Sequence, residues 1–297
     1  MVKKIVVISG PTASGKSDLA LKLAETKDIA IINADSLQIY QGLPILSSQA
    51  TEAEQKTVKH FLYSHFKPSE TSSVAIWLKL VKPIVEQLWS ENKLPVIVGG
   101  SGMYISKLVE GISEIPEIDE DIRAGARQLF DEIGQEEFQQ KLIDLGENQI
   151  PDKQRMTRAY EVLKQTGKSI SWWQERPLKK TFDEADFIHA NLNPDRRKLY
   201  ENCNSRFVKM LKSGAPDEVR SLIASGVDDD CQITKTLGFC EIRDFLDQRI
   251  TQEKMIEIAT QKTRNYAKRQ LTWFRHQLPE KAVFTDSFEA LGFLKQV

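Results

Sequence analysis

Ser9-Gly10-Pro11-Thr12-Ala13-Ser14-Gly15-Lys16-Ser17 is the stretch that decides the fold of this 297-residue chain. It follows the apolar run Ile5-Val6-Val7-Ile8 and precedes a helical pattern, and from Gly10 on it fits G-x-x-x-x-G-K-[ST] at every fixed position. Glycines let backbone N–H groups close around phosphate oxygens, the next helix directs its positive dipole end toward them, and Lys16 adds a mobile cation. The Ser17 hydroxyl is a candidate Mg²⁺ ligand. Gly10–Ser17, here called the phosphate loop, therefore predicts a diphosphate or triphosphate site; an ordinary glycine-rich strand-to-helix turn is the alternative.

The composition limits the class of protein. With 41 basic and 42 acidic residues the formal net charge is −1, so any surface for a nucleic acid has to be a local patch. The three cysteines, Cys203, Cys231 and Cys240, form no CxxC pair, which favours a reducing cytoplasm over a zinc or disulfide framework. No apolar run approaches the ~20 residues that span a bilayer, and the N-terminus lacks the features of a signal peptide. We therefore expect a cytoplasmic protein with no membrane partner.

The order of the apolar runs predicts an α/β fold, a doubly wound parallel sheet. A buried strand at 3–9, a helix at 15–26 and a second buried strand at 29–32 form one β-α-β unit. Ligands of such folds bind at the carboxyl ends of the strands, so Asp35, just after the second strand, is expected beside the phosphate loop. A third strand at 93–98 ends in Gly99-Gly100-Ser101-Gly102 at the same edge.

The rest of the chain predicts an interrupted core. Residues 37–73 suggest loops and short helices, 73–91 a helix, and 116–180 a charged helical insertion. A return strand is expected at 187–192, followed by a helix that Asn193-Pro194 caps and Gly214 ends, a helix after Pro216, and a long helix at 251–276. The predicted domains are 1–115 for the first part of the core, 116–183 for the insertion and 184–297 for the rest of the core.

Two strand ends carry candidate chemistry. Asp35 could bind Mg²⁺, take a proton from a nucleophile, or cap a helix, and the sequence leaves these roles open. Gly99-Gly100 allows a ligand to approach the backbone and Ser101 offers a hydroxyl, but the glycines could equally serve chain reversal.

Two helical stretches could contact a polyanion. In the insertion, Gln154 and Arg158 share a face opposite an apolar face, which suits phosphate or base contact but also a solvated surface. Trp172-Trp173 could stack on bases or anchor the insertion. In the long helix, Arg264, Lys268 and Arg275 fall on one stripe and the run 268–275 mixes basic and aromatic residues, although solvated charges would give the same pattern.

Five short blocks occur in a specific order. They are Gly10–Ser17, Asp35-Ser36 with Gln38 and Tyr40, Val98-Gly99-Gly100-Ser101 with Met103-Tyr104, Gln154-Arg155 with Arg158 and Glu161, and Lys268-Arg269-Gln270 with Thr272-Trp273 and Arg275. Together they resemble the tRNA dimethylallyltransferases, which prenylate an adenosine next to the anticodon. The resemblance covers nearly the whole chain and implies a P-loop NTPase-like core with a helical insertion domain, the two clasping the anticodon stem-loop as a monomer.

The resemblance also implies a site. Dimethylallyl diphosphate would place its diphosphate on the phosphate loop, with Mg²⁺ on Ser17 as the only cofactor. Asp35 would be the general base, Ser101 a hydroxyl near the diphosphate and the target nucleotide, and Arg206 a diphosphate contact, with packing as the alternative for Arg206. The residues expected to contact the tRNA anticodon stem-loop are Asp35, Ser36, Leu37, Gln38, Ser101, Arg123, Gln154, Arg155, Met156, Thr157, Arg158, Lys268 and Arg275.

Some positions depart from the family pattern. Leu46-Ser47-Ser48-Gln49 stands where Gly-Thr-Ala-Lys is common, Ser101 replaces a threonine, and Gly238-Phe239-Cys240-Glu241 replaces Gly-Tyr-Lys-Glu. These changes bear on affinity and substrate preference more than on reaction type. The rival interpretations are a small-molecule kinase, a transferase that prenylates free adenine nucleotides, and a non-catalytic RNA-binding protein.

Overall fold

The computed structural model describes residues 3–278 and 281–297. The chain divides into two compact units, one formed by Met1–Val109 with Thr181–Val297 and the other by Glu110–Lys180. The insertion expected at 116–183 falls on the second unit, which begins and ends earlier than that range. We call the two units the core and the insertion.

The core begins with an alternation of strands and helices. Its first elements are β1 (Lys3–Ser9), α1 (Lys16–Ala24), β2 (Ile29–Asn33), α2 (Glu52–Thr57), β3 (His60–Phe61), α3 (Val74–Ser90), β4 (Leu94–Gly99) and α4 (Gly102–Glu110). After the insertion come β5 (Ala185–Leu192), α8 (Arg196–Lys212), α9 (Ala215–Ala224), the 3₁₀ helix η1 (Gln232–Lys235), α10 (Phe239–Leu246), α11 (Gln252–Gln277), β6 (Ala282–Phe284) and α12 (Ser287–Lys295).

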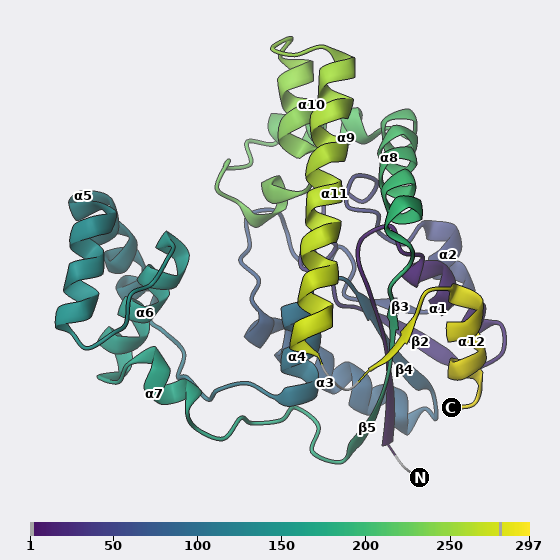
Figure 1. Ribbon diagram of the computed structural model, residues 1–297, viewed down its shortest axis with the longest axis horizontal. Coiled ribbons are helices and arrows are strands. Elements are labelled where there is room, and N and C mark those ends of the chain that lie inside the picture. Colours follow the sequence, from purple (N-terminus) through teal and green to yellow (C-terminus); the bar gives the residue numbers. More distant parts are fainter. Residues whose placement is uncertain (1–2, 279–280) are drawn as a thin grey trace. The chain divides into compact units, whose positions relative to one another are not determined.

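The strands form one parallel sheet in the order β3-β2-β4-β1-β5-β6 (Figure 1). Central strand β1 pairs with β4 on one side and β5 on the other, and Val6 lies opposite both Val96 and Ile188. Ile5 to Ile8 are fully buried, as a strand covered on both faces requires. The predicted doubly wound α/β core is confirmed.

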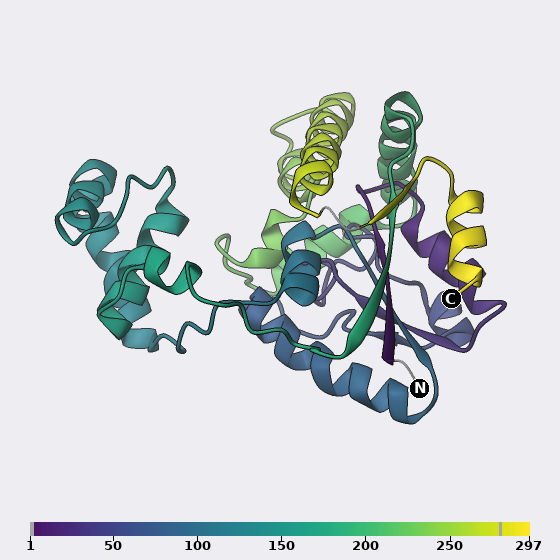
Figure 2. The same ribbon diagram turned by 60° about the horizontal axis from the view of Figure 1, so that its bottom comes forward.

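Helices cover both faces of this sheet. α1 and α12 lie side by side on one face and α3 lies on the opposite face, as the two views of the ribbon show (Figures 1 and 2). Leu19 and Leu23 of α1 and Leu294 of α12 pack with the strand side chains in one buried cluster. α8 and α11 pack against each other beyond the carboxyl ends of the strands (Figure 1). The helices that cover those strand ends therefore come mainly from the second half of the chain.

The insertion has its own small hydrophobic core. It contains α5 (Glu120–Asp144), α6 (Lys153–Thr166) and α7 (Ile170–Gln174), and a bridge between Ile112 and Lys179 closes its base. Phe138 packs against Phe130 and Tyr160 with ring centroids 5.1 and 5.3 Å apart. Gly134, with φ 76°, kinks α5 between the two halves that these rings join.

Two details differ from the prediction. The helix expected to begin at Asn193-Pro194 begins at Arg196, because Asp195 caps it by accepting from the amides of Arg197 and Lys198 at 2.9 and 3.2 Å. Asn193 still belongs to the sheet edge, since its amide donates to the carbonyl of Phe284 at 2.7 Å. The proline cap was therefore wrong, and β3, β6, α4, α10 and α12 were not predicted.

None of the helices within residues 3–278 and 281–297 is both long enough and apolar enough to cross a membrane.

A buried polar cluster lies where the sheet meets the phosphate loop. The Ser9 hydroxyl is 2.7 Å from Nε2 of His189 and accepts a hydrogen bond from the Asn191 amide at 2.7 Å. Burial, assisted by the positive charge of Lys281, lowers the pKa of His189 to about 4. His189 is therefore neutral at pH 7, and it is 5% exposed.

We predict that His189 makes stability depend on pH. Its pKa rises from about 4 in the folded protein to the ordinary histidine value of 6.5 on unfolding, so the unfolded chain binds a proton first as the pH falls. The free energy of unfolding should drop between pH 6.5 and 4, by up to about 3 kcal/mol, and level off below. His189→Gln, which keeps a hydrogen-bonding amide near Ser9, should lack this part of the pH dependence in urea unfolding. Parallel curves for the two proteins would contradict the assignment.

Candidate active site

The phosphate loop has a backbone shape that few sequences allow. Gly10, Ala13 and Gly15 have φ of 148°, 62° and 91°. A Cβ on Gly10 would lie 2.5 Å from the carbonyl oxygen of Leu192, so the first glycine is required by close approach to β5. Such alternation of backbone conformations turns successive N–H groups toward one concavity, which suits an anion.

Lys16 folds back over this loop. Its ammonium donates to the carbonyl of Pro11 at 2.7 Å. Burial lowers the pKa of Lys16 to about 8, opposed by the negative charge of Asp35 and assisted by the positive charge of Arg206. The three charged groups therefore lie within electrostatic range of one another. The buried hydroxyl of Ser14 has no hydrogen-bond partner within residues 3–278 and 281–297, which leaves it available to a phosphate oxygen.

Arg206 reaches the loop from α8. Its guanidinium donates to the hydroxyl of Thr12 at 2.5 Å, and burial lowers its pKa, opposed by Cys203 and Asp35. Arg206 therefore makes a direct polar contact with the phosphate loop in addition to any packing role. A guanidinium placed here is suited to phosphate oxygens.

Asp35 is held by its own turn at the end of β2. The side-chain oxygen of Asn33 accepts from the Asp35 amide at 2.8 Å, and the amide group of Asn33 donates to the carbonyls of Asp35 and Leu62, both at 3.0 Å. Oδ1 of Asp35 accepts from the backbone amides of Leu37 and Gln38 at 3.0 and 3.4 Å. In the described chain both hydrogen bonds to this carboxylate use Oδ1, and they stabilise a turn. The helix-capping role is wrong, because the next helix, α2, begins only at Glu52. Oδ2 can still serve a ligand.

The charge of Asp35 acts on two tyrosines that belong to helices of the core. Burial raises the pKa of Tyr266, on α11, and the charge of Asp35 raises it further. For Tyr104, on α4, burial also raises the pKa, a hydrogen bond to Ser72 opposes this, and Asp35 adds to the rise. The sequence assigned neither tyrosine a role in the site, because their proximity to Asp35 follows only from the tertiary fold.

Ser101 joins the ends of β2 and β4. Its hydroxyl accepts from the amide of Ser36 at 2.9 Å and lies 3.3 Å from the hydroxyl of Ser36. A Cβ on Gly99 would lie 2.1 Å from the carbonyl oxygen of Ala34, so this glycine permits the two strand ends to approach. The structure thus brings the Asp35 turn and Ser101 together. Ser36, Leu37 and Gln38 are half-buried, and Gln38 donates to the carbonyls of Ser47 and Ser48 at 2.9 and 3.0 Å.

α11 closes the site with residues whose contacts the sequence alone did not predict. Gln270 accepts from the amide of Thr12 and donates to the carbonyl of Gly100, both at 2.8 Å. A Cβ on Gly102 would lie 2.1 Å from the ring of Trp273, so α4 and α11 are in close contact. Gln270 stood within the quoted block 268–270, but nothing in a single sequence indicates hydrogen bonds across so many residues.

The outer face of α11 carries basic side chains. Lys268 and Arg275 are exposed, whereas Arg264 donates to the side chains of Asn204 and Gln261 at 2.7 and 2.6 Å. An open pocket of about 590 Å³ lies along this helix. Its lining is Asn265, Lys268, Arg269, Thr272, Trp273, His276 and Gln277.

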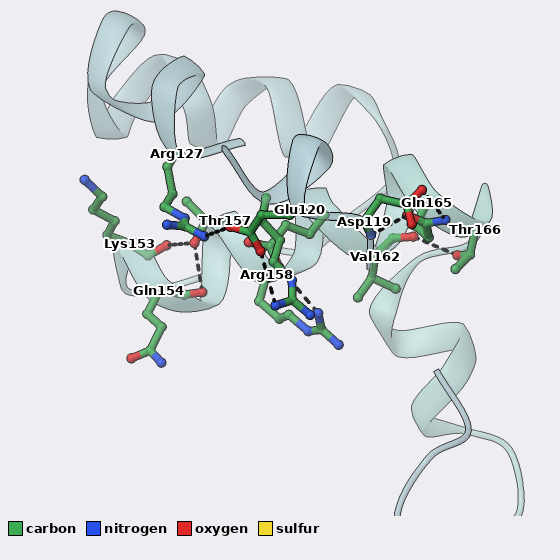
Figure 3. A network of polar contacts seen from close by, with 12 residues as sticks. Asp119, Glu120, Arg127, Lys153, Gln154, Thr157, Arg158, Val162, Gln165 and Thr166 are labelled. Atoms are coloured by element: carbon green, nitrogen blue, oxygen red, sulfur yellow. Dashed lines mark hydrogen bonds and ion pairs between the residues drawn. The ribbon is translucent and has the colours of Figure 1, made fainter. Parts of the chain in front are cut away.

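In the insertion, only part of the predicted set on α6 is exposed. Figure 3 shows the polar contacts around Gln154, Thr157 and Arg158. Gln154 and Arg155 are exposed, and Arg158 forms an ion pair with Glu161 at 3.4 Å. Met156 is fully buried and Thr157 is 7% exposed, with its hydroxyl donating to the carbonyl of Lys153 at 3.0 Å.

The Met156 and Thr157 side chains thus serve packing and helix geometry, and a contact with RNA would have to use their backbone. Arg123, on α5, forms an ion pair with Glu120, with 3.6 Å between its guanidinium nitrogen and the carboxylate oxygen.

The tryptophan pair is half-buried. The guanidinium of Arg176 lies 3.5 Å from the centroid of the Trp172 ring, and Trp173 donates to the hydroxyl of Thr166 at 3.2 Å. Arg176 therefore covers one face of the Trp172 ring, and Trp173 helps to anchor α7.

A parallel sheet whose first strand runs into this loop defines the class of P-loop α/β proteins. Residues 38–277 match the model of the IPP transferase family. The chain is 42% identical to a tRNA dimethylallyltransferase of Anaplasma phagocytophilum over 94% of its length and 89% of the relative, and 40% identical to one of Rickettsia bellii over 97% and 92%. The crystal structure of a tRNA isopentenylpyrophosphate transferase from Bacillus halodurans matches with a TM-score of 0.71 at 30% identity, over 99% of this chain and 95% of that one.

The chain belongs to the IPP transferase family, and the resemblance found in the sequence is confirmed.

We predict that Gly102→Ala destabilises the core although alanine favours helices. The added Cβ would collide with the Trp273 ring, an overpacking that costs about 1–3 kcal/mol. Gly292→Ala, in α12 with open space around its Cβ position, is the matched control and should gain about 0.5–1 kcal/mol. Urea unfolding of both variants measures the difference, and an equal gain for both would show that Trp273 moves aside freely.

Proposed function

We propose that this protein transfers a dimethylallyl group from dimethylallyl diphosphate to the exocyclic amine of the adenosine 3′ to the anticodon in tRNA. The observation that carries the proposal is that the phosphate loop, bonded to Arg206 through Thr12, lies at the same edge of the sheet as the Asp35 turn and Ser101. Membership of the IPP transferase family and the names of the relatives support it.

The reaction needs a base near the nucleophile. The lone pair of an exocyclic adenine amine is delocalised into the ring, so the amine is weakly nucleophilic. Asp35 would accept a hydrogen bond from it and then its proton as nitrogen bonds to the allylic carbon. Such assistance contributes typically ~10²–10⁴ in rate. The turn that fixes Oδ1 on the Leu37 and Gln38 amides orients the carboxylate for this step.

The leaving group needs stabilisation of negative charge. As the allylic carbon–oxygen bond breaks, its electron pair goes to the diphosphate, where Lys16, Arg206 and the loop amides would bind it. Extruding the adenosine from its stack costs a few kcal/mol, which contacts with the RNA backbone would offset. Ser101, next to Ser36, would face both substrates.

Mg²⁺ fits this donor set only together with the substrate. Within residues 3–278 and 281–297 no cluster of three or more His, Cys, Asp or Glu could hold a metal ion. The exposed hydroxyl of Ser17 at the end of the phosphate loop would share Mg²⁺ with diphosphate oxygens, an arrangement that this ion favours. Bound there, Mg²⁺ would neutralise part of the leaving-group charge.

The tRNA anticodon stem-loop would be bound by cationic and amide side chains of both units, which are exposed except for the half-buried Arg123 and Arg158. In the core these are Lys268 and Arg275 of α11, and in the insertion Arg123, Gln154, Arg155 and Arg158. We propose that the protein acts as a monomer in the cytoplasm.

The proposal is tested by offering the pure protein and Mg²⁺ labelled dimethylallyl diphosphate with unmodified tRNA or with free AMP. Label entering tRNA alone is expected. Label in AMP would move the acceptor to free nucleotides. No label in either, together with ATP consumption on a small-molecule acceptor, would favour a kinase.

We predict that Asp35→Ala and Asp35→Asn both nearly abolish prenyl transfer, by about 10²–10⁴, while tRNA binding stays within about twofold. The asparagine keeps an oxygen for the Leu37 amide, so it separates loss of the base from loss of the turn. Single-turnover rates and filter binding measure the two effects. An unchanged rate in the asparagine variant would remove Asp35 as the base.

We predict that Arg158→Ala weakens tRNA binding on the order of tenfold and leaves binding of dimethylallyl diphosphate unchanged, because this arginine lies in the insertion. Lys141→Ala, which removes one exposed charge from α5 of the same unit, is the control and should bind tRNA normally. Equal loss in both variants would indicate only a general effect of charge.

A further inference from the structure

Gln270 makes two long-range hydrogen bonds with one amide group. Its Oε1 accepts from the backbone N–H of Thr12, in the phosphate loop, and its Nε2 donates to the carbonyl of Gly100, at the end of β4. Both distances are 2.8 Å and the side chain is 7% exposed. One buried side chain of α11 thus ties the loop to the turn that carries Ser101.

The chemistry of this position admits few side chains. The two partners determine which end of the Gln270 amide is the oxygen, because the backbone N–H of Thr12 can only donate and the carbonyl of Gly100 can only accept. An ionised glutamate would turn an oxygen toward the Gly100 carbonyl, and a methionine would fill the space without either bond. A Cβ on Gly100 would lie 2.5 Å from Nε2, so the glycine and the glutamine fit each other.

Thr12 is therefore held from two helices. Gln270 of α11 binds its amide, and Arg206 of α8 binds its hydroxyl. Ala13, the next residue, has a positive φ of 62°. Restraining Thr12 limits the conformations open to the amides that follow it, and such preorganisation favours anion binding.

We propose that Gln270 is a positioning residue that holds the phosphate loop in its diphosphate-binding shape and in register with the Gly100-Ser101 turn. The inference rests on the proposed function only in taking dimethylallyl diphosphate as the ligand. The two sides of α11 would then have different roles. The buried Gln270 amide acts on the diphosphate site, and the exposed Lys268 and Arg275 do not depend on that amide.

The test is Gln270→Met, which nearly conserves volume. Calorimetry with inorganic diphosphate and Mg²⁺ should show binding about tenfold weaker than in the wild type, because the loop is no longer restrained. The KM for dimethylallyl diphosphate should rise in parallel, while the dissociation constant for tRNA stays within about twofold.

Thr263→Val is the matched control on the same helix. Thr263 is 5% exposed and its hydroxyl donates at 2.8 Å to the carbonyl of Ala259, within α11. This variant loses a buried hydrogen bond without touching the loop, so it should lower the melting temperature and leave diphosphate binding unchanged. Equal weakening of diphosphate binding in both variants, or wild-type binding in Gln270→Met, would overturn the proposal.

Gln270→Glu supplies a second, independent readout if the methionine variant fails to fold. A protonated carboxyl group can accept from Thr12 and donate to Gly100, whereas the carboxylate can only accept. The ratio of its diphosphate dissociation constant to that of the wild type should therefore fall as the pH is lowered from 8 to 6. A ratio independent of pH would contradict the role of the paired hydrogen bonds.

These measurements need no RNA. Wild-type protein that binds diphosphate but labels no tRNA would remove the proposed function and leave the role of Gln270 standing. Wild-type protein that labels tRNA, with a Gln270→Met variant of unchanged donor KM, would do the reverse.

Discussion

The position of the phosphate loop depends on β1, which is paired along its length with β4 on one side and β5 on the other. A strand held from both sides cannot shift without breaking both ladders, so the end of β1 is fixed before any ligand binds. Ser9 adds a buried side-chain bond to Asn191, and Gly10 passes so close to the carbonyl of Leu192 that no Cβ fits. The same geometry delivers the ends of β2 and β4 to the same edge, where Asp35 and Ser101 meet. A loop that must hold a highly charged leaving group is thus placed by the sheet and needs little reorganisation.

The sequence allowed the sheet to be predicted where local signals and tertiary structure agree. β1, β2 and β4 are nearly continuous apolar runs, as strands buried on both faces are, and the loop motif fixed the direction of the first of them. β5 is less regular, since Asp186, His189 and Asn191 interrupt its apolar residues. β6 has only three residues, Ala282–Phe284, and is a strand because β5 lies beside it. The start of α8 also depends on this pair of strands. The Asn193 amide, just after β5, donates to Phe284 of β6, so the chain stays extended until Asp195 caps α8. Where a neighbouring strand supplies a hydrogen-bond partner, this tertiary pairing overrides the local conformational preference of the sequence.

The site was predictable to a similar degree and for the same reason. The rule that ligands bind at strand ends placed Asp35 and Ser101 at one edge from sequence alone. Arg206 and the tRNA contacts came from family resemblance, and burial now shows that the Met156 and Thr157 side chains face the interior of the insertion. Gln270 and Tyr104 belong to blocks that carried the resemblance. Their place beside the loop or Asp35, like that of Tyr266, could not be predicted, because it arises from α4 and α11 folding over the strand ends. Such contacts leave no periodicity or spacing in a single sequence.

α11 links the two halves of the proposed reaction through its rigidity. Gln270 and Phe274 are one turn apart on its buried side, while Lys268 and Arg275 stand on its exposed side. In a regular helix these residues hold fixed relative positions, so a polyanion bound by the exposed side would be registered against the loop that Gln270 restrains. Trp273, packed over Gly102, resists rotation of the helix about its own axis. If the diphosphate site and the polyanion surface stood on separate flexible loops, thermal motion would change their relative position. One helix, hydrogen-bonded to the phosphate loop and to the end of β4, keeps that position fixed.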